Sequence, residues 1–501
     1  MRDVSTSLDM TTDLLEDRRT FWIVAALVVF LFAIANLPWQ LDDYDQAKQA
    51  FTSFEMVKQG HWFYQHTPHE RIATKPPLVG WISAAVFAVT RSWEIAWRFP
   101  SFVAALVLAV VLFRAANDAY GKVAAVIAVS AFGLNLLSPR LATLVRTDMP
   151  LALVIFLIGL LIWQRIRERG EWKLRDQIYV FVLLTAAMLI KGPIVYAFLL
   201  PGIALFQSRR GTARPADAPN TNSASAWPGW WPWLASLAIF LTWVAGGIRF
   251  QPGFYEEVVM REFVGRFGET IHRPQPLLFY IPHLLHKFAP WSVLMIAIAV
   301  VDLRSRDWRV RSMFREMSPE IRWLLCWSMG GLIVMSLIPS KRVDRIFPVI
   351  PPFCLLLAAQ IFATERPARR PYLWMVAALA LAVFFTGGYT GWKVITGYGD
   401  RRNALALFGR DIRHEAEAHH WRYEVVSAKD EGLLLYLRKM HFVERTDAIA
   451  EWNGGNLEAL VASDEKAAVL MRDLKGAALS RLQSAKREGD QHSGGYVLIT
   501  R

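Results

Sequence analysis

Lysine, arginine and aspartate side chains stand beside apolar segments at several separate points of this chain. Cations of this kind bind phosphate groups and stabilise the charge that develops on a departing phosphate. A carboxylate can orient a substrate hydroxyl or remove its proton. We therefore expect a site for a phosphorylated substrate if the fold brings these residues together. The candidate carboxylates are Asp45 and Asp148, and the candidate cations are Lys48, Lys75, Lys191, Lys341 and Arg342.

The segments that separate these charges are long and apolar. The chain has 501 residues, 54% of them hydrophobic, and apolar runs of membrane-spanning length recur along it. Its 21 Trp and 30 Phe residues fit the aromatic belts of a membrane protein. Basic cytoplasmic loops and contacts with membrane lipids explain the net charge of +13, so no nucleic-acid partner is expected. The predicted fold class is an all-α polytopic membrane bundle of about 11 to 13 transmembrane helices.

The distribution of charge predicts the orientation of this bundle. The first apolar run, 20–39, follows a polar, charged tail, and we expect a membrane anchor that leads outward rather than a cleaved signal peptide. The loop 41–76 then lies on the outer face, and the topology places all seven candidate residues on that face. Residues 389–501 alternate helical patterns with short strand candidates at 423–427, 457–462 and 496–500, which predicts a small C-terminal α/β soluble domain after a transmembrane domain at 1–388.

The number of crossings after the first loop is a test of this topology. The chain must cross the membrane an odd number of times between the outer loop 41–76 and the basic, cytoplasmic loop 166–176. Four apolar segments lie between these loops. The segment 77–90 is the shortest of them, so either this segment does not span fully or one of the segment boundaries is misplaced.

Histidines in the polar loops are the candidate metal ligands. His61, His66 and His69 follow the first helix, where surface histidines are the simpler interpretation. His272 precedes a later apolar helix, and we keep it as a candidate ligand for a divalent metal. No cofactor is otherwise expected, and the two cysteines lie inside apolar segments, so they predict no disulfide framework.

Several short motifs follow one another in order along the chain. Single motifs such as KGP are weak indicators, whereas the ordered set is specific. Over roughly residues 20 to 390, as bounded by hydropathy, the set resembles the bacterial GT-C glycosyltransferases of protein mannosyltransferase-like and aminoarabinose transferase-like type. The motifs are DQAKQA at 45–50, EM at 55–56, TKPPL at 74–78, RFPS at 98–101, RTDMP at 146–150, IKGP at 190–193 and SK at 340–341.

The resemblance implies a fold and an activity. The fold is the GT-C membrane bundle, with juxtamembrane helices in the first outer loop and a periplasmic C-terminal domain. The activity is the transfer of a hexose or pentose, with inversion, from a polyprenyl phosphate such as undecaprenyl phosphate. The acceptor would be a glycolipid such as lipid A or another envelope glycan, in preference to a protein. The location would be the bacterial inner membrane, with the active site on the periplasmic face.

The resemblance also assigns roles to residues. It places the family's first acidic position on Asp45, which would activate or orient the acceptor, and the second on Asp148. It places the donor-phosphate cations on Lys48, Lys75, Lys191 and Lys341. The chain departs from the family pattern at Gln46, where a glutamate is common, at Thr74, where aminoarabinose transferases have glutamate, and at Arg345, where an aromatic residue is usual.

Two other interpretations use the same residues. Asp45 precedes a helical pattern and could serve as a helix N-cap instead of, or in addition to, acting on a substrate. The cations could line the binding groove of a transporter or flippase for an anionic lipid-linked substrate. Transporters often contain inverted repeats with a site at mid-depth, whereas this chain shows no internal repeat and its charges gather at one face. We therefore favour the glycosyltransferase interpretation.

Overall fold

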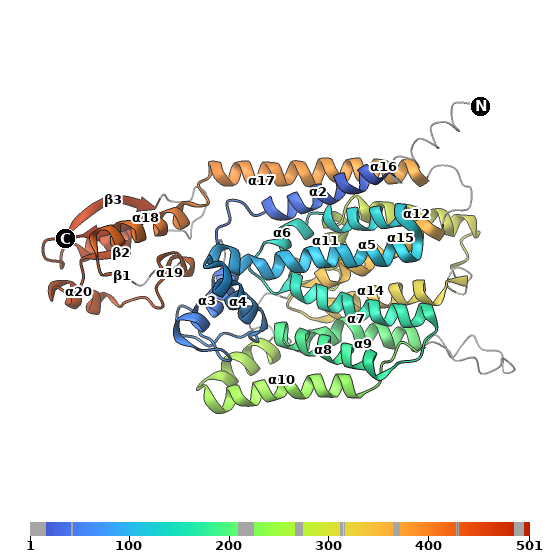
Figure 1. Ribbon diagram of the computed structural model, residues 1–501, viewed down its shortest axis with the longest axis horizontal. Helices are drawn as coiled ribbons and strands as arrows, with labels where there is room; N and C mark the ends of the chain where they lie inside the picture. The colour runs from blue at the N-terminus through green and yellow to red at the C-terminus, as the bar shows by residue number, and fades with distance from the viewer. Residues whose placement is uncertain are drawn as a thin grey trace.

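Long helices lie side by side in one bundle, and a small domain with a β-sheet projects from one end of it (Figure 1). The structure is a computed structural model. The fold class predicted from the sequence is confirmed: the protein is a multi-pass helical membrane bundle with a small α/β domain. The structure describes residues 17–41, 44–208, 225–265, 274–310, 314, 316–363, 371–426, 428, 430–484 and 495–501.

In its described residues, the first third of the chain forms six helices, and apolar residues of all of them except α3 join those of the later helices in one buried core. Helix α3 is amphipathic and lies at the end of the bundle, next to the C-terminal domain, with α4 beside it (Figure 1). The helices are α2 (Arg18–Ile34), α3 (Tyr44–Gln59), α4 (Leu78–Thr90), α5 (Trp93–Gly133), α6 (Ser138–Ala142) and α7 (Asp148–Glu168).

The remaining helices complete the bundle. Helices α9 and α14 pack so closely that the backbones of Gly202 and Gly330 meet. The elements are α8 (Leu174–Lys191), α9 (Ile194–Ser208), α10 (Trp231–Phe250), the π-helix η1 (Tyr255–Val264), α11 (Tyr280–Lys287), α12 (Trp291–Ser305), α14 (Pro319–Leu337), the 3-10 helix η2 (Val343–Val349), α15 (Ile350–Ala363), α16 (Pro371–Ala382), the π-helix η3 (Val383–Gly387) and α17 (Gly388–Gly399).

Between α4 and the end of α7 the chain runs along the bundle three times. At the end of the bundle near α3, Ser101 Oγ donates hydrogen bonds to the carbonyl oxygens of Leu144 (2.8 Å) and Arg146 (3.1 Å). At the opposite end, Arg167 Nη2 donates to the carbonyl oxygen of Asp118 at 3.0 Å. The chain therefore runs away from α3 along the first part of α5, returns after the break at Gly121, and runs away from α3 again along α7. Helix α4, with 13 residues, is about 20 Å long and too short to span about 30 Å of hydrocarbon.

Six helices among the described residues are long and apolar enough to cross a membrane, or seven if the bent pair α11 and α12 forms one span. The expected number of 11 to 13 stays a prediction. Helix α2 has 17 residues, just under the length of the spanning helices, and α8 carries Arg175, Asp176 and Lys191 among its 18 residues. The last span runs from Leu373 to Gly399, so it extends past the boundary expected at residue 388.

The C-terminal domain contains a four-stranded sheet in the order β1-β2-β4-β3, in which only β1 and β2 are parallel. The strand predicted at 496–500 agrees with β4, and those predicted at 423–427 and 457–462 overlap β1 and β2. The exposed strand β3 was not predicted, since it has few apolar residues. The elements are α18 (Ala404–His419), β1 (Tyr423–Val425), α19 (Glu431–Leu437), α20 (Arg445–Asn453), β2 (Ala459–Ser463), α21 (Asp464–Leu470), β3 (Ala478–Ser484) and β4 (Tyr496–Thr500).

The C-terminal domain packs against the first outer loop through helix α19. Leu435 and Tyr436 join a buried apolar cluster with Phe51 of α3 and Trp97 of α5. The Tyr436 hydroxyl also accepts a hydrogen bond from the backbone N–H of Leu41 at 2.7 Å. These contacts hold α3 between the bundle and the C-terminal domain, which positions the start of α3 over the ends of α7 and α8.

Candidate active site

A pocket of about 220 Å³ lies at the end of the bundle that carries the C-terminal domain. It opens between α3, the segment before α4, the start of α7, the end of α8, and the helices η1 and η2. Eight cationic and five carboxylate side chains line it, which is a formal excess of three positive charges. These residues are Lys48, Arg71, Lys75, Arg146, Lys191, Arg261, Arg342 and Arg345 among the cations, and Asp45, Asp148, Glu257, Glu262 and Asp344 among the carboxylates.

Asp45 lies in the first turn of α3 and contacts two arginines from distant parts of the chain. Arg342 Nη1 donates to Asp45 Oδ2 at 2.5 Å, and Arg146 Nη2 lies 3.6 Å from the same oxygen. Both arginines also form ion pairs with Asp344, and Arg342 Nη2 lies 3.2 Å from Asp344 Oδ2. Burial alone would raise the pKa of Asp45, but the charges of Lys75 and Arg342 outweigh it and hold that pKa below its ordinary range. Asp45 is therefore ionised at neutral pH.

Lys75 stands in the Thr74-Lys75-Pro76-Pro77 segment that leads into α4. Its side chain is half-buried, and no described residue forms an ion pair with it within 4.0 Å. Loss of hydration, with the nearby charge of Lys191, lowers the pKa of Lys75 to about 8. A desolvated ammonium that lacks a direct partner is suited to bind an anionic substrate.

Asp148 and Lys191 form an ion pair between the first turn of α7 and the last residue of α8. Helix α8 ends there because Gly192 has φ +74°, a conformation that favours glycine. Asp148 is buried and Lys191 is nearly so. This pair fixes the ends of two helices against each other and places both charges on the wall of the pocket.

Lys48 lies one turn after Asp45 on the same side of α3. Its Nζ is 5.8 Å from the centre of the Tyr44 ring, and burial lowers the pKa of its ammonium. Lys341 is placed differently from the expectation. It is buried beside the pocket rather than lining it, and its Nζ donates to the carbonyl oxygen of Gln275 at 3.0 Å.

The structure thus brings six of the seven candidates to one pocket and leaves Lys341 outside its lining. The metal ligand expected at His272 lies outside the described residues. Sequence reasoning did not select Arg146 or Asp344, although Arg146 is part of the RTDMP motif. Asp344 follows Arg342 by two residues, and only its contacts with two arginines distinguish it. The departure at Arg345 places a further cation on the pocket wall.

Known proteins with similar sequences are lipid-phosphate-dependent sugar transferases. A sequence model described as dolichyl-phosphate-mannose-protein mannosyltransferase matches residues 74–215. The undecaprenyl phosphate-alpha-4-amino-4-deoxy-L-arabinose arabinosyl transferase of Shewanella sediminis (strain HAW-EB3) is 23% identical over 352 residues, covering 69% of this chain and 61% of that protein. Transferase 2 of the same name from Proteus mirabilis (strain HI4320) is 23% identical and covers 66% and 57%. The chain spans about three fifths of the length of these relatives.

Solved structures with the same arrangement of helices support this similarity. ArnT from Cupriavidus metallidurans, in a crystal structure bound to undecaprenyl phosphate, superposes with a TM-score of 0.67 over 95% of this chain and 97% of that one, at 16% identity. The apo oligosaccharyltransferase of Archaeoglobus fulgidus superposes with a TM-score of 0.52 over 92% of this chain and 72% of that one, at 12% identity. The chain has the GT-C fold, and its resemblance to ArnT-like glycosyltransferases is confirmed.

Proposed function

We propose that this protein is an integral-membrane glycosyltransferase that moves a sugar from a polyprenyl phosphate to an acceptor at the outer face of the membrane. Several relatives are named for transfer from an undecaprenyl phosphate sugar, and the ArnT structure contains undecaprenyl phosphate. The observation that carries the proposal is the pocket with three positive charges in excess, placed where membrane helices end. Such a pocket fits a phosphate that is attached to a lipid chain.

The donor phosphate would bind where the cations lack partners of their own. Neither Lys75 nor Lys48 forms an ion pair within 4.0 Å among the described residues, and Lys48 Nζ lies 5.8 Å from the centre of the Tyr44 ring. Three further cations are already paired with carboxylates: Arg146, Arg342 and Lys191. They contribute positive electrostatic potential to the pocket rather than free hydrogen-bond donors. We infer that Lys75 and Lys48 contact the phosphate directly, and that the paired cations stabilise its negative charge without contacting it.

The reaction would be a single displacement at the anomeric carbon. The acceptor oxygen forms a bond to that carbon, the bond from the carbon to the phosphate oxygen breaks, and its electron pair leaves with the polyprenyl phosphate. Cations around the pocket stabilise the charge that develops on this leaving group. Displacement from the opposite side of the sugar would invert the anomeric configuration.

Asp45 is better suited to orient the acceptor than to act as a strong base. Two arginines and Lys75 keep its carboxylate ionised and lower its basicity. Such a carboxylate can accept a hydrogen bond from the acceptor hydroxyl and hold the oxygen toward the anomeric carbon. The proton can pass to the departing phosphate monoester, whose second pKa of about 6 makes it the better acceptor. Asp148 would then hold Lys191 in place rather than contact the acceptor.

The arrangement at this end of the bundle supports a proposal for the acceptor and for the location. The C-terminal domain, expected at 389–501, lies beside the pocket helix α3 (Figure 1). We infer a periplasmic domain in the inner membrane of a bacterium, and an amphiphilic acceptor such as lipid A or another envelope glycan. A glycolipid would reach the pocket with its own tails in the same membrane as the donor.

The experiment is sugar transfer by the full-length protein in membranes that are supplied with a radiolabelled polyprenyl-phosphate sugar. We expect Asp45→Asn and Lys75→Ala to reduce transfer at least a hundredfold, since each removes a charge that acts in the transition state. Lys48→Ala should raise the KM for the donor. Lys58→Ala is the matched control, because Lys58 is exposed on the same helix and does not line the pocket.

Undiminished transfer by both the Asp45 and Lys75 variants would overturn the site. Transfer that is absent from wild-type protein, together with movement of the labelled lipid between leaflets, would instead identify a flippase. Mass spectrometry of envelope lipids from cells with and without the protein would then identify the product.

A further inference from the structure

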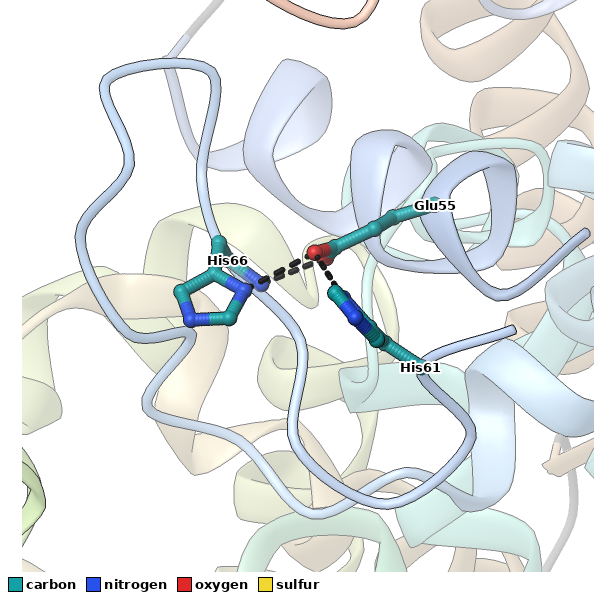
Figure 2. A group of neighbouring side chains, drawn as sticks. All are labelled: Glu55, His61 and His66. Atoms are coloured by element: carbon teal, nitrogen blue, oxygen red, sulfur yellow. Dashed lines mark hydrogen bonds and ion pairs between the residues drawn. The ribbon is translucent and has the colours of Figure 1, made fainter. Parts of the chain in front are cut away.

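Three potential metal-binding side chains converge in the first outer loop, outside the pocket described above. Glu55 belongs to α3 and is buried, while His61 and His66 follow the end of that helix (Figure 2). Gly60, with φ +77°, turns the chain back so that the loop lies against α3. We propose that Glu55, His61 and His66 bind a divalent transition metal of the zinc class, which closes the first outer loop onto α3.

The geometry brings one donor atom of each residue to a common point. The Nδ1 atoms of His61 and His66 each lie 2.8 Å from Glu55 Oε1, and the three donor atoms are all within 4.8 Å of one another. Both rings point at the same carboxylate in Figure 2. Zinc bonds of about 2.0 to 2.2 Å in a tetrahedron place neighbouring ligand atoms about 3.4 Å apart. Small rotations of the two rings therefore suffice to admit the ion.

The loop backbone holds these donors in place independently of any ion. The backbone N–H of His66 donates to Glu55 Oε2 at 2.5 Å, and Gln65 Nε2 donates to the His61 carbonyl oxygen at 2.9 Å. An isolated antiparallel β-bridge between His66 and Ile72 fixes the far side of the loop. A site whose ligands are already oriented loses little entropy when it binds.

The chemistry of the donors selects the ion. Two imidazoles with one carboxylate suit zinc and its neighbours in the transition series, whereas calcium and magnesium prefer oxygen ligands only. Each imidazole can free Nδ1 by keeping its hydrogen on Nε2. His61 is 47% exposed, so the fourth position of the ion would face solvent and hold a water molecule.

The position of the cluster indicates a structural role. Glu55 is ten residues after Asp45 on the same helix, a rise of about 15 Å, and the three proposed ligands do not line the pocket, so the ion would lie away from Asp45. Two hydrogen bonds also join the loop to α10. The Tyr64 hydroxyl donates to the Trp243 carbonyl oxygen at 3.0 Å, and Trp243 Nε1 donates to the Phe63 carbonyl oxygen at 3.1 Å. Metal binding would stiffen this connection. The inference does not depend on the proposed transferase activity.

The test is direct metal binding by the full-length protein in detergent, purified without a polyhistidine tag and stripped with a chelator. We expect wild-type protein to bind one equivalent of Zn²⁺ by calorimetry and by elemental analysis after gel filtration. Its Tm should rise when Zn²⁺ is added. The His61→Gln and His66→Gln double variant should bind at least tenfold more weakly and show no rise in Tm.

The control is His69→Gln, in the same loop but outside the cluster, which should bind as wild type does. Because Glu55 also holds the loop backbone, Glu55→Gln could fail to fold, and the half-exposed His61 makes the single variant His61→Gln the safer test. Absence of stoichiometric binding by folded wild-type protein would overturn the proposal. Equal affinity in wild type and double variant would overturn it as well.

Discussion

Glu431 provides a quantitative test of how the C-terminal domain is held on the first outer loop. It begins helix α19, is only 4% exposed, and neither of its carboxylate oxygens has a hydrogen-bond partner among the described residues. Burial raises its pKa from an ordinary value of 4.5 to about 7, and the charge of Lys48 only partly opposes this. The other groups that face it are His69, with Nε2 at 3.6 Å, and Tyr44.

The direction of the pH dependence follows from this raised pKa. Between pH 4.5 and about 7 the folded protein holds a proton on Glu431 that the unfolded chain has lost, so stability falls as pH rises through this window. Above pH 7 the ionised carboxylate remains in its buried position. The difference between the two pKa values lowers the free energy of unfolding by on the order of 3 kcal/mol at pH 8, and by under about 1 kcal/mol at pH 5.

The perturbation is Glu431→Gln, which removes the charge and keeps the shape. We expect the variant to be more stable than wild type by about 2 to 3 kcal/mol at pH 8 and nearly equal to it at pH 5. Hydrogen exchange of the α19 amides, corrected for the intrinsic rate at each pH, measures this opening free energy. Glu451→Gln in α20 is the control, because Glu451 is exposed and should show no such difference. An α19 that opens as easily in Glu431→Gln as in wild type at pH 8 would refute the reasoning.

Two further predictions concern the pocket and the core of the bundle. The pKa of about 8 at Lys75 predicts that kcat/KM for the donor falls roughly tenfold between pH 7 and 9, as the ammonium loses its proton. Lys75→Arg should move this fall to higher pH. An unchanged pH profile in the variant would contradict the role of Lys75. Gly330→Ala should lower the Tm in detergent, because its Cβ would lie 2.4 Å from the backbone N of Gly202. We expect the substitution to reduce the free energy of unfolding by about 1 to 3 kcal/mol. Gly391→Ala, with open space around the new Cβ, should melt as wild type does.

Much of the fold follows from local patterns in the sequence. Apolar runs predicted the helical bundle, because each helix satisfies its own backbone hydrogen bonds and needs only an apolar surface to lie in a membrane. The buried strands β2 and β4 were predicted from short apolar segments, whereas β3 is mostly exposed and has no such segment. Incomplete spanning by the short segment 77–90 was one of two explanations for the even number of apolar segments, and α4 proves to be too short to span.

The sequence by itself determined which residues could do chemistry, since charges beside membrane segments are costly and few. Only the tertiary structure decided how they pair. Arg342 meets Asp45 across 297 residues, while Lys341, its neighbour in the chain, turns to the carbonyl oxygen of Gln275. Likewise, surface histidines were the simpler interpretation of His61 and His66 until the loop folded onto Glu55. The physical reason is that pairing depends on the rotation and register of packed helices, which are set by the whole core rather than by neighbouring residues.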